Sequence, residues 1–156
     1  MRLRAVVGFG ANLGDRLQTL RTAARALARV ARVERTSHVY ATAPVGPPQP
    51  EFLNAAALVE FAGTPIGLLD ALLGIEASLG RERTAPWGPR VIDLDLLWCD
   101  GITERSARLT VPHARLHERA FAIVPMIEVC PDARDPLSGE PYRVPTGDVA
   151  MTVDLL

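Results

Sequence analysis

The sequence predicts a single α+β domain with a ferredoxin-like split βαβ arrangement. In this arrangement an antiparallel sheet carries its helices on one face and leaves the other as an open substrate-binding face. Three observations support the prediction. Strand-like and helix-like segments alternate as β-α-β-β-α-β, with further segments at the C-terminal end. The 156 residues are 48% hydrophobic and 22% charged, as in one soluble domain over residues 1–156. No repeat or linker divides them.

The first half contains two predicted strands and the helix between them. Ala5–Phe9 is a short apolar run closed by glycines, as in a strand that enters a turn. Leucine and alanine then recur at helical spacing from Leu17 to Ala31, and arginines occupy the rest of this helix. We interpret these arginines as a solvated face and not as a nucleic-acid surface, because the net charge of the chain is −1. Val33–Ala43 is rich in β-branched and aromatic residues and predicts the second strand.

The second half continues the pattern after a proline-rich break. Four prolines in residues 44–50 exclude both a helix and a central strand there. The elements expected next are a strand over Phe52–Phe61, a helix that starts at Thr64 and Pro65 and stops at Gly80, a strand over Val91–Trp98, and a helix over Leu116–Val129 that contains Pro125. The tail after this helix is rich in turn residues, and we predict no element in it.

The composition excludes several classes of function. All seventeen basic residues are arginine, and a Walker-A phosphate loop, a protein-kinase strand lysine and Schiff-base chemistry each need a lysine. Cys99 and Cys130 have no CxxC spacing, which indicates reduced thiols. No apolar run has the length of a signal-peptide core or approaches the roughly 20 residues of a membrane span. We therefore expect a cytoplasmic monomer that binds neither nucleic acid nor membrane.

Two aspartates on the strand over Val91–Trp98 are the most informative candidates for chemistry. Asp93 and Asp95 alternate with apolar residues, so both carboxylates point to one face while the apolar residues point to the core. Their Cβ atoms would lie about 7 Å apart. Carboxylates this close repel each other unless a proton or a cation lies between them. Oxygen ligands completed by water and phosphate suit Mg²⁺; the alternative is two solvated aspartates on an open sheet face.

Basic residues surround this aspartate pair in the sequence. They are Arg81, Arg83 and Arg90 before it, and Arg108, His113 and Arg119 after it. Guanidinium groups are forked donors that match phosphate oxygens. Carboxylates, a metal and arginines together would hold a polyphosphate and stabilise transferring charge. The alternative is that these arginines form ordinary surface ion pairs with nearby glutamates such as Glu82, Glu104 and Glu118.

Two other patterns point to chemistry less well. Gly8, Gly10 and Gly14 approximate a dinucleotide-binding glycine pattern, but the last glycine comes one residue too late. His113 and His117 have the spacing of a zinc-binding helix, but residue 114 is Ala where that motif requires Glu. We expect neither a dinucleotide site nor a zinc site.

Three segments of the chain together resemble one enzyme family, the 6-hydroxymethyl-7,8-dihydropterin pyrophosphokinases of folate biosynthesis. These segments are Trp87–Leu97, Thr42–Pro47 and Leu109–His113. The resemblance covers nearly the whole chain, and its W-G-P-R-x-x-D-L-D core is highly specific. It implies a ferredoxin-like fold, ATP as co-substrate and two Mg²⁺ ions. The implied reaction transfers pyrophosphate to the pterin hydroxymethyl group and releases AMP.

The resemblance also implies a role for each matching position. Asp93 and Asp95 would hold the magnesium ions, and with Arg81 and Arg90 they would form the catalytic set. The ATP-binding set would comprise Glu76, Arg81, Arg83, Trp87, Arg90, Arg108, Thr110, His113 and Arg119. The pterin-binding set would comprise Gly10, Thr42, the Val45 backbone, Asn54, Asp93 and the aromatic pair Phe52 and Phe121, which would stack on the two faces of the pterin.

The pterin side can also be argued from the residues themselves. A flat heterocycle with a polar edge needs a stacking face and hydrogen-bonding groups around its rim. Phe52 and Asn54 are two residues apart on a predicted strand and so share a face, although a core phenylalanine and a strand-end asparagine would look the same. Two other functions stay open from the residues alone: a ligand-sensing module without enzyme activity, and a metal-dependent phosphohydrolase.

Overall fold

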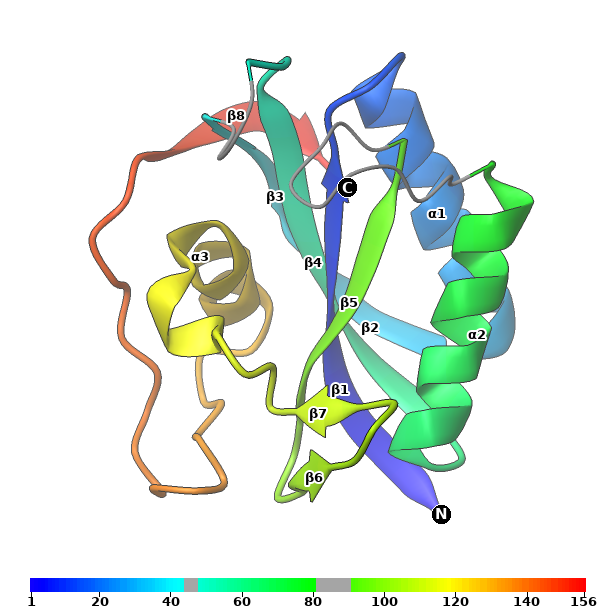
Figure 1. Cartoon of the computed structure of the whole chain (residues 1–156), viewed down its shortest axis with the longest axis vertical. Helices are drawn as coiled ribbons and strands as arrows, with labels where there is room; N and C mark the ends of the chain where they lie inside the picture. The colour runs from blue at the N-terminus through cyan, green and yellow to red at the C-terminus, as the bar shows by residue number, and fades with distance from the viewer. Residues whose placement is uncertain (44–47, 81–90) are drawn as a thin grey trace.

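A computed structural model of the chain shows a six-stranded sheet with helices on both sides (Figure 1). The structure describes residues 1–43, 48–80 and 91–156. Its elements are β1 Arg2–Ala11, α1 Arg16–Val30, β2 Arg32–Thr36, β3 His38–Thr42, β4 Phe52–Ala62, α2 Pro65–Ser78, β5 Asp93–Cys99, β6 Glu104–Arg105, β7 Thr110–Val111, η1 Leu116–Glu118, α3 Ala120–Val129 and β8 Val149–Leu155. The predicted α+β order is confirmed.

The sheet has β4 at its centre and β1 between β4 and the edge strand β5. The strand order is β5-β1-β4-β3-β8, with β2 pairing to β4 beside this path, and all pairings are antiparallel. Antiparallel neighbours place opposite residues on the same face. Residues from β5, β1 and β4 that are distant in the sequence therefore lie in one row across the sheet.

The two faces of the sheet carry different cores. Helices α1 and α2 cover one face, over a core that includes Leu27 and Leu72, and α3 lies on the other (Figure 1). The sequence predicts that this second face is open. The structure corrects this expectation, because α3 covers part of it (Figure 1). Val6 and Trp98 point to it and are at most 1% exposed under α3. These apolar side chains favour a covering helix because burial removes them from water.

One predicted strand is two strands in the structure. Val33–Ala43 is interrupted at Ser37, whose N–H donates to the Ala56 carbonyl at 3.0 Å and whose Oγ accepts from the Ala56 N–H at 2.9 Å. The side chain of Ser37 thus takes the place of a ladder acceptor. Between the Thr36–Ala57 and Tyr40–Asn54 pairs, this side of the ladder has one extra residue, which is a bulge.

Helix α2 begins and ends where the sequence predicts. Thr64 Oγ1 accepts from the Gly67 N–H at 3.1 Å, Pro65 occupies the first helical position, and Gly80 follows the end with a φ of +78°. The hydroxyl satisfies one of the N–H groups that the first turn leaves unbonded. A positive φ is the conformation that glycine adopts without steric cost.

The C-terminal part differs most from the prediction. The expected helix over Leu116–Val129 is a short 3₁₀ turn, η1, followed by α3. The tail also supplies β8, which pairs with β3 and which the sequence did not predict. Residues 151–155 do alternate apolar and polar side chains, which is a strand signal that we did not use. Unlike the apolar side of a half-buried strand, Met151, Val153 and Leu155 are all more than half exposed.

Both cysteines are buried and free. Burial raises the pKa of the Cys99 thiol to about 12 and that of the Cys130 thiol to about 11. Both therefore stay protonated near neutral pH and are poor nucleophiles. Among the described residues, no helix has the length and apolar character needed to cross a bilayer.

Candidate active site

Four strands bring predicted site residues to one end of the sheet. Gly10 lies near the end of β1 and Thr42 ends β3, while Phe52 begins β4 and Asp93 begins β5. The register sets Asp93 opposite Gly10, and Gly10 opposite Asn54. Opposite residues share a face, and here it is the face that carries α3. The pairing thus unites residues that lie more than 80 positions apart in the sequence.

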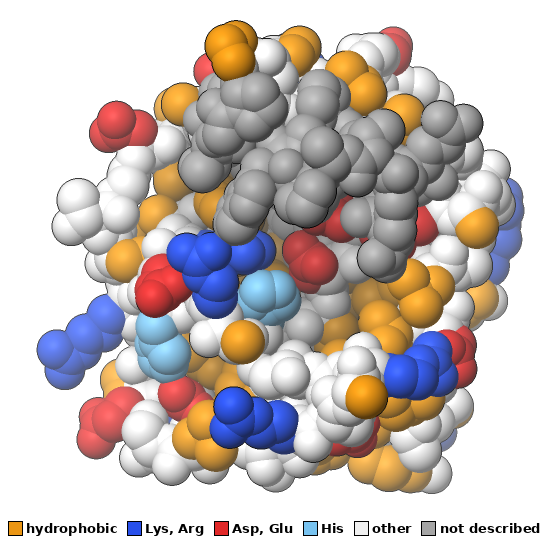
Figure 2. All heavy atoms as spheres, viewed as in Figure 1, with side chains coloured by type: hydrophobic (Ala, Val, Ile, Leu, Met, Phe, Trp, Pro, Cys, Tyr) orange, Lys and Arg blue, Asp and Glu red, His pale blue; other side chains and the backbone are white. Residues whose placement is uncertain are grey.

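The two aspartates project from β5 as predicted. Leu94 and Leu96 are buried in the core under α1 and α2, and Asp93 and Asp95, which are half-buried, point to the opposite face. In Figure 2 acidic side chains on this face lie beside basic and histidine side chains at the border of the grey atoms. The predicted strand alternation therefore holds at the metal-ligand candidates.

Each aspartate faces a residue that has no side chain. Gly10 is the cross-strand neighbour of Asp93, and Gly8 is the neighbour of Asp95. A Cβ atom on Gly8 would lie 3.0 Å from Leu97, and one on Gly10 would lie 3.3 Å from the Asn54 side chain. The side chains of Leu97 and Asn54 thus lie close over these two glycines, in space that a side chain at residue 8 or 10 would contest. Gly8 was missed in the sequence, although its two-residue spacing from Gly10 on one strand was a usable signal.

The carboxylate pair fits magnesium. Asp93 and Asp95 offer oxygen ligands only, and Mg²⁺ is bound by one or two carboxylates together with water and substrate phosphates. Over the described ranges, no group of three or more His, Cys, Asp or Glu side chains could hold a metal ion. The chemistry of the donors thus matches a cation shared with a polyphosphate.

Thr42 and Asn54 are joined by a hydrogen bond. The Asn54 Nδ2 group donates to Thr42 Oγ1 at 2.8 Å, and both residues are buried. This bond uses one of the two amide hydrogens of Asn54 and fixes the orientation of its carbonyl oxygen. Phe52 lies two residues before Asn54 on β4 and therefore on the same face. Two residues of the predicted pterin rim, Thr42 and Asn54, are therefore bonded to each other, and the half-buried ring of Phe52 is on the same face.

Helix α3 places the second predicted aromatic residue on the same side of the sheet. Phe121 is in the first turn of α3 and packs at the border of the core under this helix. The Arg119 guanidinium carbon lies 5.6 Å from the centre of the Phe121 ring, within the range of a cation–π contact. The contact orients a guanidinium and a ring that the sequence assigned to different substrates.

His113 lies in a cluster of charges beside β5. Its backbone N–H donates to the Leu97 carbonyl at 2.8 Å, and its ring Nδ1 accepts from the Arg115 backbone N–H at 3.2 Å. Burial lowers the pKa of His113, the Arg119 charge lowers it further, and the Asp93 carboxylate opposes this effect. The ring is therefore neutral near pH 7 with its hydrogen on Nε2, which leaves a donor for an anionic ligand.

Glu76 reaches from α2 to the backbone of β5. It is 4% exposed, and its Oε2 accepts from the Leu94 N–H at 2.7 Å. Leu94 stands between Asp93 and Asp95, on the outer edge strand of the sheet. The sequence placed Glu76 among the ATP contacts, and the structure directs one of its oxygens to the backbone that carries both aspartates.

Two other predicted ATP contacts lie near the opposite end of β5. Arg108 forms an ion pair with Asp70 of α2, and Thr110 is an exposed residue of β7. The hairpin that carries them follows the Asp100–Gly101 turn after β5, whereas Asp93 and Asp95 occupy the first half of this strand. Five further predicted residues lie outside the described ranges: Val45, Arg81, Arg83, Trp87 and Arg90.

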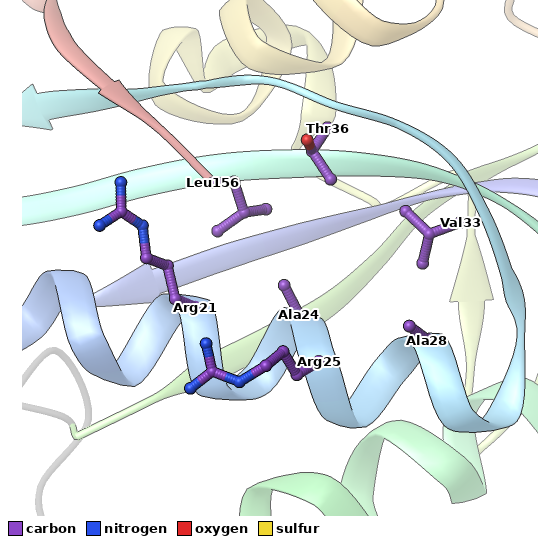
Figure 3. A pocket seen from close by; sticks show the side chains of 7 residues that line it. All are labelled: Arg21, Ala24, Arg25, Ala28, Val33, Thr36 and Leu156. Atoms are coloured by element: carbon purple, nitrogen blue, oxygen red, sulfur yellow. The ribbon is translucent and has the colours of Figure 1, made fainter.

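A hollow of about 290 Å³ lies elsewhere on the molecule, between α1, β2 and the last residue (Figure 3). It is lined by Arg21, Ala24, Arg25 and Ala28 of α1 together with Val33, Thr36 and Leu156, and its lining has no Asp or Glu side chain. It contains none of the residues that the sequence predicts for substrate or metal. The candidate active site is thus the end of the sheet that carries Asp93, Asn54 and Gly10.

Comparison with known proteins identifies the family of the chain. The family model for 7,8-dihydro-6-hydroxymethylpterin-pyrophosphokinase (HPPK) matches residues 6–131. The chain belongs to this family. A pyrophosphokinase of this type from Synechocystis is 44% identical over 87% of this chain and 71% of its own length. Another, from Methylorubrum extorquens, is 45% identical over 83% of this chain and 84% of its own.

A solved structure shows the same fold. A crystal structure of HPPK-DHPS from Plasmodium falciparum superimposes with a TM-score of 0.71 at 14% identity. It covers 92% of this chain, which spans only 43% of that larger protein. At this identity the likeness concerns the fold alone. Family membership and the fold together make the chain an HPPK-type, ATP-dependent pyrophosphokinase of folate biosynthesis.

Proposed function

We propose that the chain, acting as a single domain, transfers pyrophosphate from ATP to the hydroxymethyl group of 6-hydroxymethyl-7,8-dihydropterin and releases AMP. The observation that carries this proposal is the cross-strand row Asp93–Gly10–Asn54. In this row the Asp93 carboxylate, which could bind a metal–phosphate complex, lies on one side of Gly10. The Asn54 amide, which could bond the edge of a heterocycle, lies on the other side. An acceptor and a donor substrate could therefore meet over Gly10.

The pterin ring would lie beside Gly10, between Asn54 and Asp93. Phe52 and Phe121 would stack on its two faces, and the Asn54–Thr42 pair would bond its polar edge. Because Thr42 holds one amide hydrogen of Asn54, the carbonyl oxygen and the second hydrogen stay available to one ring edge. A side chain at Gly10 would take this space. We assign the Val45 backbone to the same rim by family resemblance.

The triphosphate would lie on the other side of Asp93. Two Mg²⁺ ions held by Asp93 and Asp95 would neutralise phosphate charge when bound. His113 Nε2 and the Arg119 guanidinium would donate to phosphate oxygens from the far side. By resemblance, Arg81, Arg83 and Arg90 would add further guanidinium donors, while Glu76, Trp87, Arg108 and Thr110 would complete the nucleotide site.

The reaction itself needs no protein nucleophile. The pterin hydroxyl oxygen would attack the β-phosphorus of ATP in line, and AMP would leave. The chain's own groups would hold the two substrates in this alignment and balance the developing charge. The neutral His113 would supply a hydrogen bond without taking up a proton first.

The direct test is to identify the products by mass. The purified chain would be incubated with ATP, Mg²⁺ and 6-hydroxymethyl-7,8-dihydropterin, and we expect AMP and pterin diphosphate in equal amounts. Release of inorganic phosphate without transfer would indicate a phosphohydrolase instead. Binding of the pterin with no turnover would indicate a sensing module, and either result would contradict the proposal.

A further inference from the structure

We propose that Glu128 of α3 is a positioning residue that holds the two walls of the pterin pocket at a fixed separation. The proposal rests on the function proposed above. One wall is α3, which carries Phe121. The other is the end of the sheet where β3 finishes and β4 begins, which carries Thr42 and Asn54. Glu128 lies outside every set of site residues that the sequence suggested.

The Glu128 carboxylate bonds to β3 at several points. Tyr40 donates its hydroxyl hydrogen to Oε1 at 2.5 Å, and the His38 N–H lies 3.1 Å from each oxygen. The His38 ring Nδ1 is 2.8 Å from Oε2, and a carboxylate partner at this distance places the ring hydrogen on Nδ1. One side chain thus binds a hydroxyl, a backbone amide and an imidazole of the same strand.

The Glu128 carboxyl group is ionised at neutral pH. Burial by itself would raise the pKa of Glu128, but the hydrogen bonds from Tyr40 and His38 outweigh this effect and hold the pKa below its ordinary value. Burial also raises the pKa of the Tyr40 hydroxyl, and the neighbouring carboxylate raises it further, so this hydroxyl remains a donor. Hydrogen bonds to a charged acceptor are about twice as strong as neutral ones.

We call the Glu128 carboxylate and its bonds to His38 and Tyr40 the clamp. Its partners on β3 are on the same strand as Thr42, which belongs to the proposed pterin rim. His38, Tyr40 and Thr42 alternate along β3, so their side chains share the face that carries α3. Tyr40 is also the cross-strand neighbour of Asn54. A shift of β3 along or away from α3 would therefore displace Thr42 and its hydrogen bond to Asn54.

On α3, Glu128 belongs to the same helix as Phe121, the aromatic residue of the proposed pterin pocket. Phe121 and Glu128 are seven residues apart, two helical turns, and so lie on the same side of α3. Pro125 stands between them and has no N–H to donate to the Phe121 carbonyl. The helix therefore lacks one of its own bonds between the two turns. Ile123 and Met126, which are both fully buried, hold it against the sheet together with Glu128.

The test separates pterin binding from nucleotide binding. In Glu128→Ala we expect the KM for 6-hydroxymethyl-7,8-dihydropterin to rise roughly tenfold, since small misplacements of binding groups are costly. The dissociation constant for MgATP, measured without pterin, should stay within about twofold of wild type because the phosphate groups lie on the other side of Asp93. Glu128→Gln keeps an acceptor for Tyr40 and should restore most of the pterin affinity.

Two further variants keep the test decisive. Tyr40→Phe removes one bond of the clamp without a change in packing, and it should raise the pterin KM in the same direction if Glu128→Ala proves too unstable to purify. Glu60→Gln weakens the ion pair with Arg2, which involves the other end of β4, and should change neither constant. A folded Glu128→Ala enzyme with a normal pterin KM would overturn the proposal, as would equal losses of pterin and ATP affinity. Absence of pterin diphosphate with the wild-type chain would instead contradict the proposed function.

Discussion

At the scale of single residues, the environment of Asp93 and Asp95 distinguishes them from the other acidic residues of the chain. Both stand opposite a glycine on β1, so the residue beside each aspartate on that strand has no side chain of its own. Neither contributes to the apolar core on the other side of β5. Their contribution to catalysis can therefore be separated from their contribution to folding.

The Asp95→Asn variant tests this separation. It keeps the size of the side chain and removes the charge that would hold a cation. We therefore expect turnover to fall by roughly 100-fold or more, which corresponds to about 3 kcal/mol or more. The melting temperature should change little. Asp100→Asn, which removes an exposed carboxylate just beyond the opposite end of β5, is the matched control. Near-normal turnover of Asp95→Asn would argue against a two-carboxylate metal site.

His113 gives a prediction about pH. Its pKa is lowered in the folded state by burial and by the Arg119 charge, so the unfolded chain takes up this proton at a higher pH than the folded chain does. Its neutral form is therefore fully favourable above the unfolded value of about 6.5, and stability is lost as the pH falls below it. We expect the free energy of unfolding to drop more between pH 7 and pH 5 in the wild type than in His113→Gln. Urea titrations at both pH values measure this difference, and equal drops would contradict the prediction.

At the scale of elements, the contact between α2 and β5 restrains the strand that carries Asp93 and Asp95. β5 is an edge strand, so its outer N–H groups have no neighbouring strand. Glu76 satisfies one of them, that of Leu94, from within the core layer between helix and sheet. The same bond restrains the backbone between the two aspartates.

The Glu76→Ala variant should expose the value of this bond. Loss of the acceptor leaves the Leu94 N–H buried and unsatisfied, which should lower the free energy of unfolding by about 1–3 kcal/mol. Glu76→Gln retains an acceptor oxygen and should lose less than half as much. Denaturant unfolding of the two variants measures both values. Equal losses would mean that the negative charge matters more than the hydrogen bond.

At the scale of the whole molecule, Asp93 lies between the residues that we assign to the two substrates. It faces Gly10 and Asn54 across the sheet, and its charge acts on His113 from the other side. A ligand that binds one side therefore changes the environment of the other. Such coupling is reciprocal for binding free energies.

We therefore expect MgATP to raise the affinity for the pterin. Calorimetry of 6-hydroxymethyl-7,8-dihydropterin binding with and without a non-hydrolysable ATP analogue should show tighter binding by about fivefold or more when the nucleotide is present. The pterin should strengthen binding of the analogue by the same factor. Equal affinities in the two titrations would show that the two sides are independent.

The sequence by itself determined the local features of this protein. Alternation along 93–96 showed which side chains of β5 are apolar and which carry carboxylates, because strand periodicity is a property of adjacent residues. Thr64, Pro65 and Gly80 marked the ends of α2 for the same reason, since caps act within one turn. The motif around Asp93 and Asp95 also led to the correct family.

Only the tertiary structure decided what those local features face. The place of β1 between β4 and β5 created the Asp93–Gly10–Asn54 row, and strand neighbours depend on contacts between residues far apart in the chain. The cover of the second face by α3, the bond from Glu76 to Leu94 and the addition of β8 to β3 were also not predicted. Each depends on which apolar surface or unpaired backbone group another element can reach once the chain is compact, and periodicity carries no information about that.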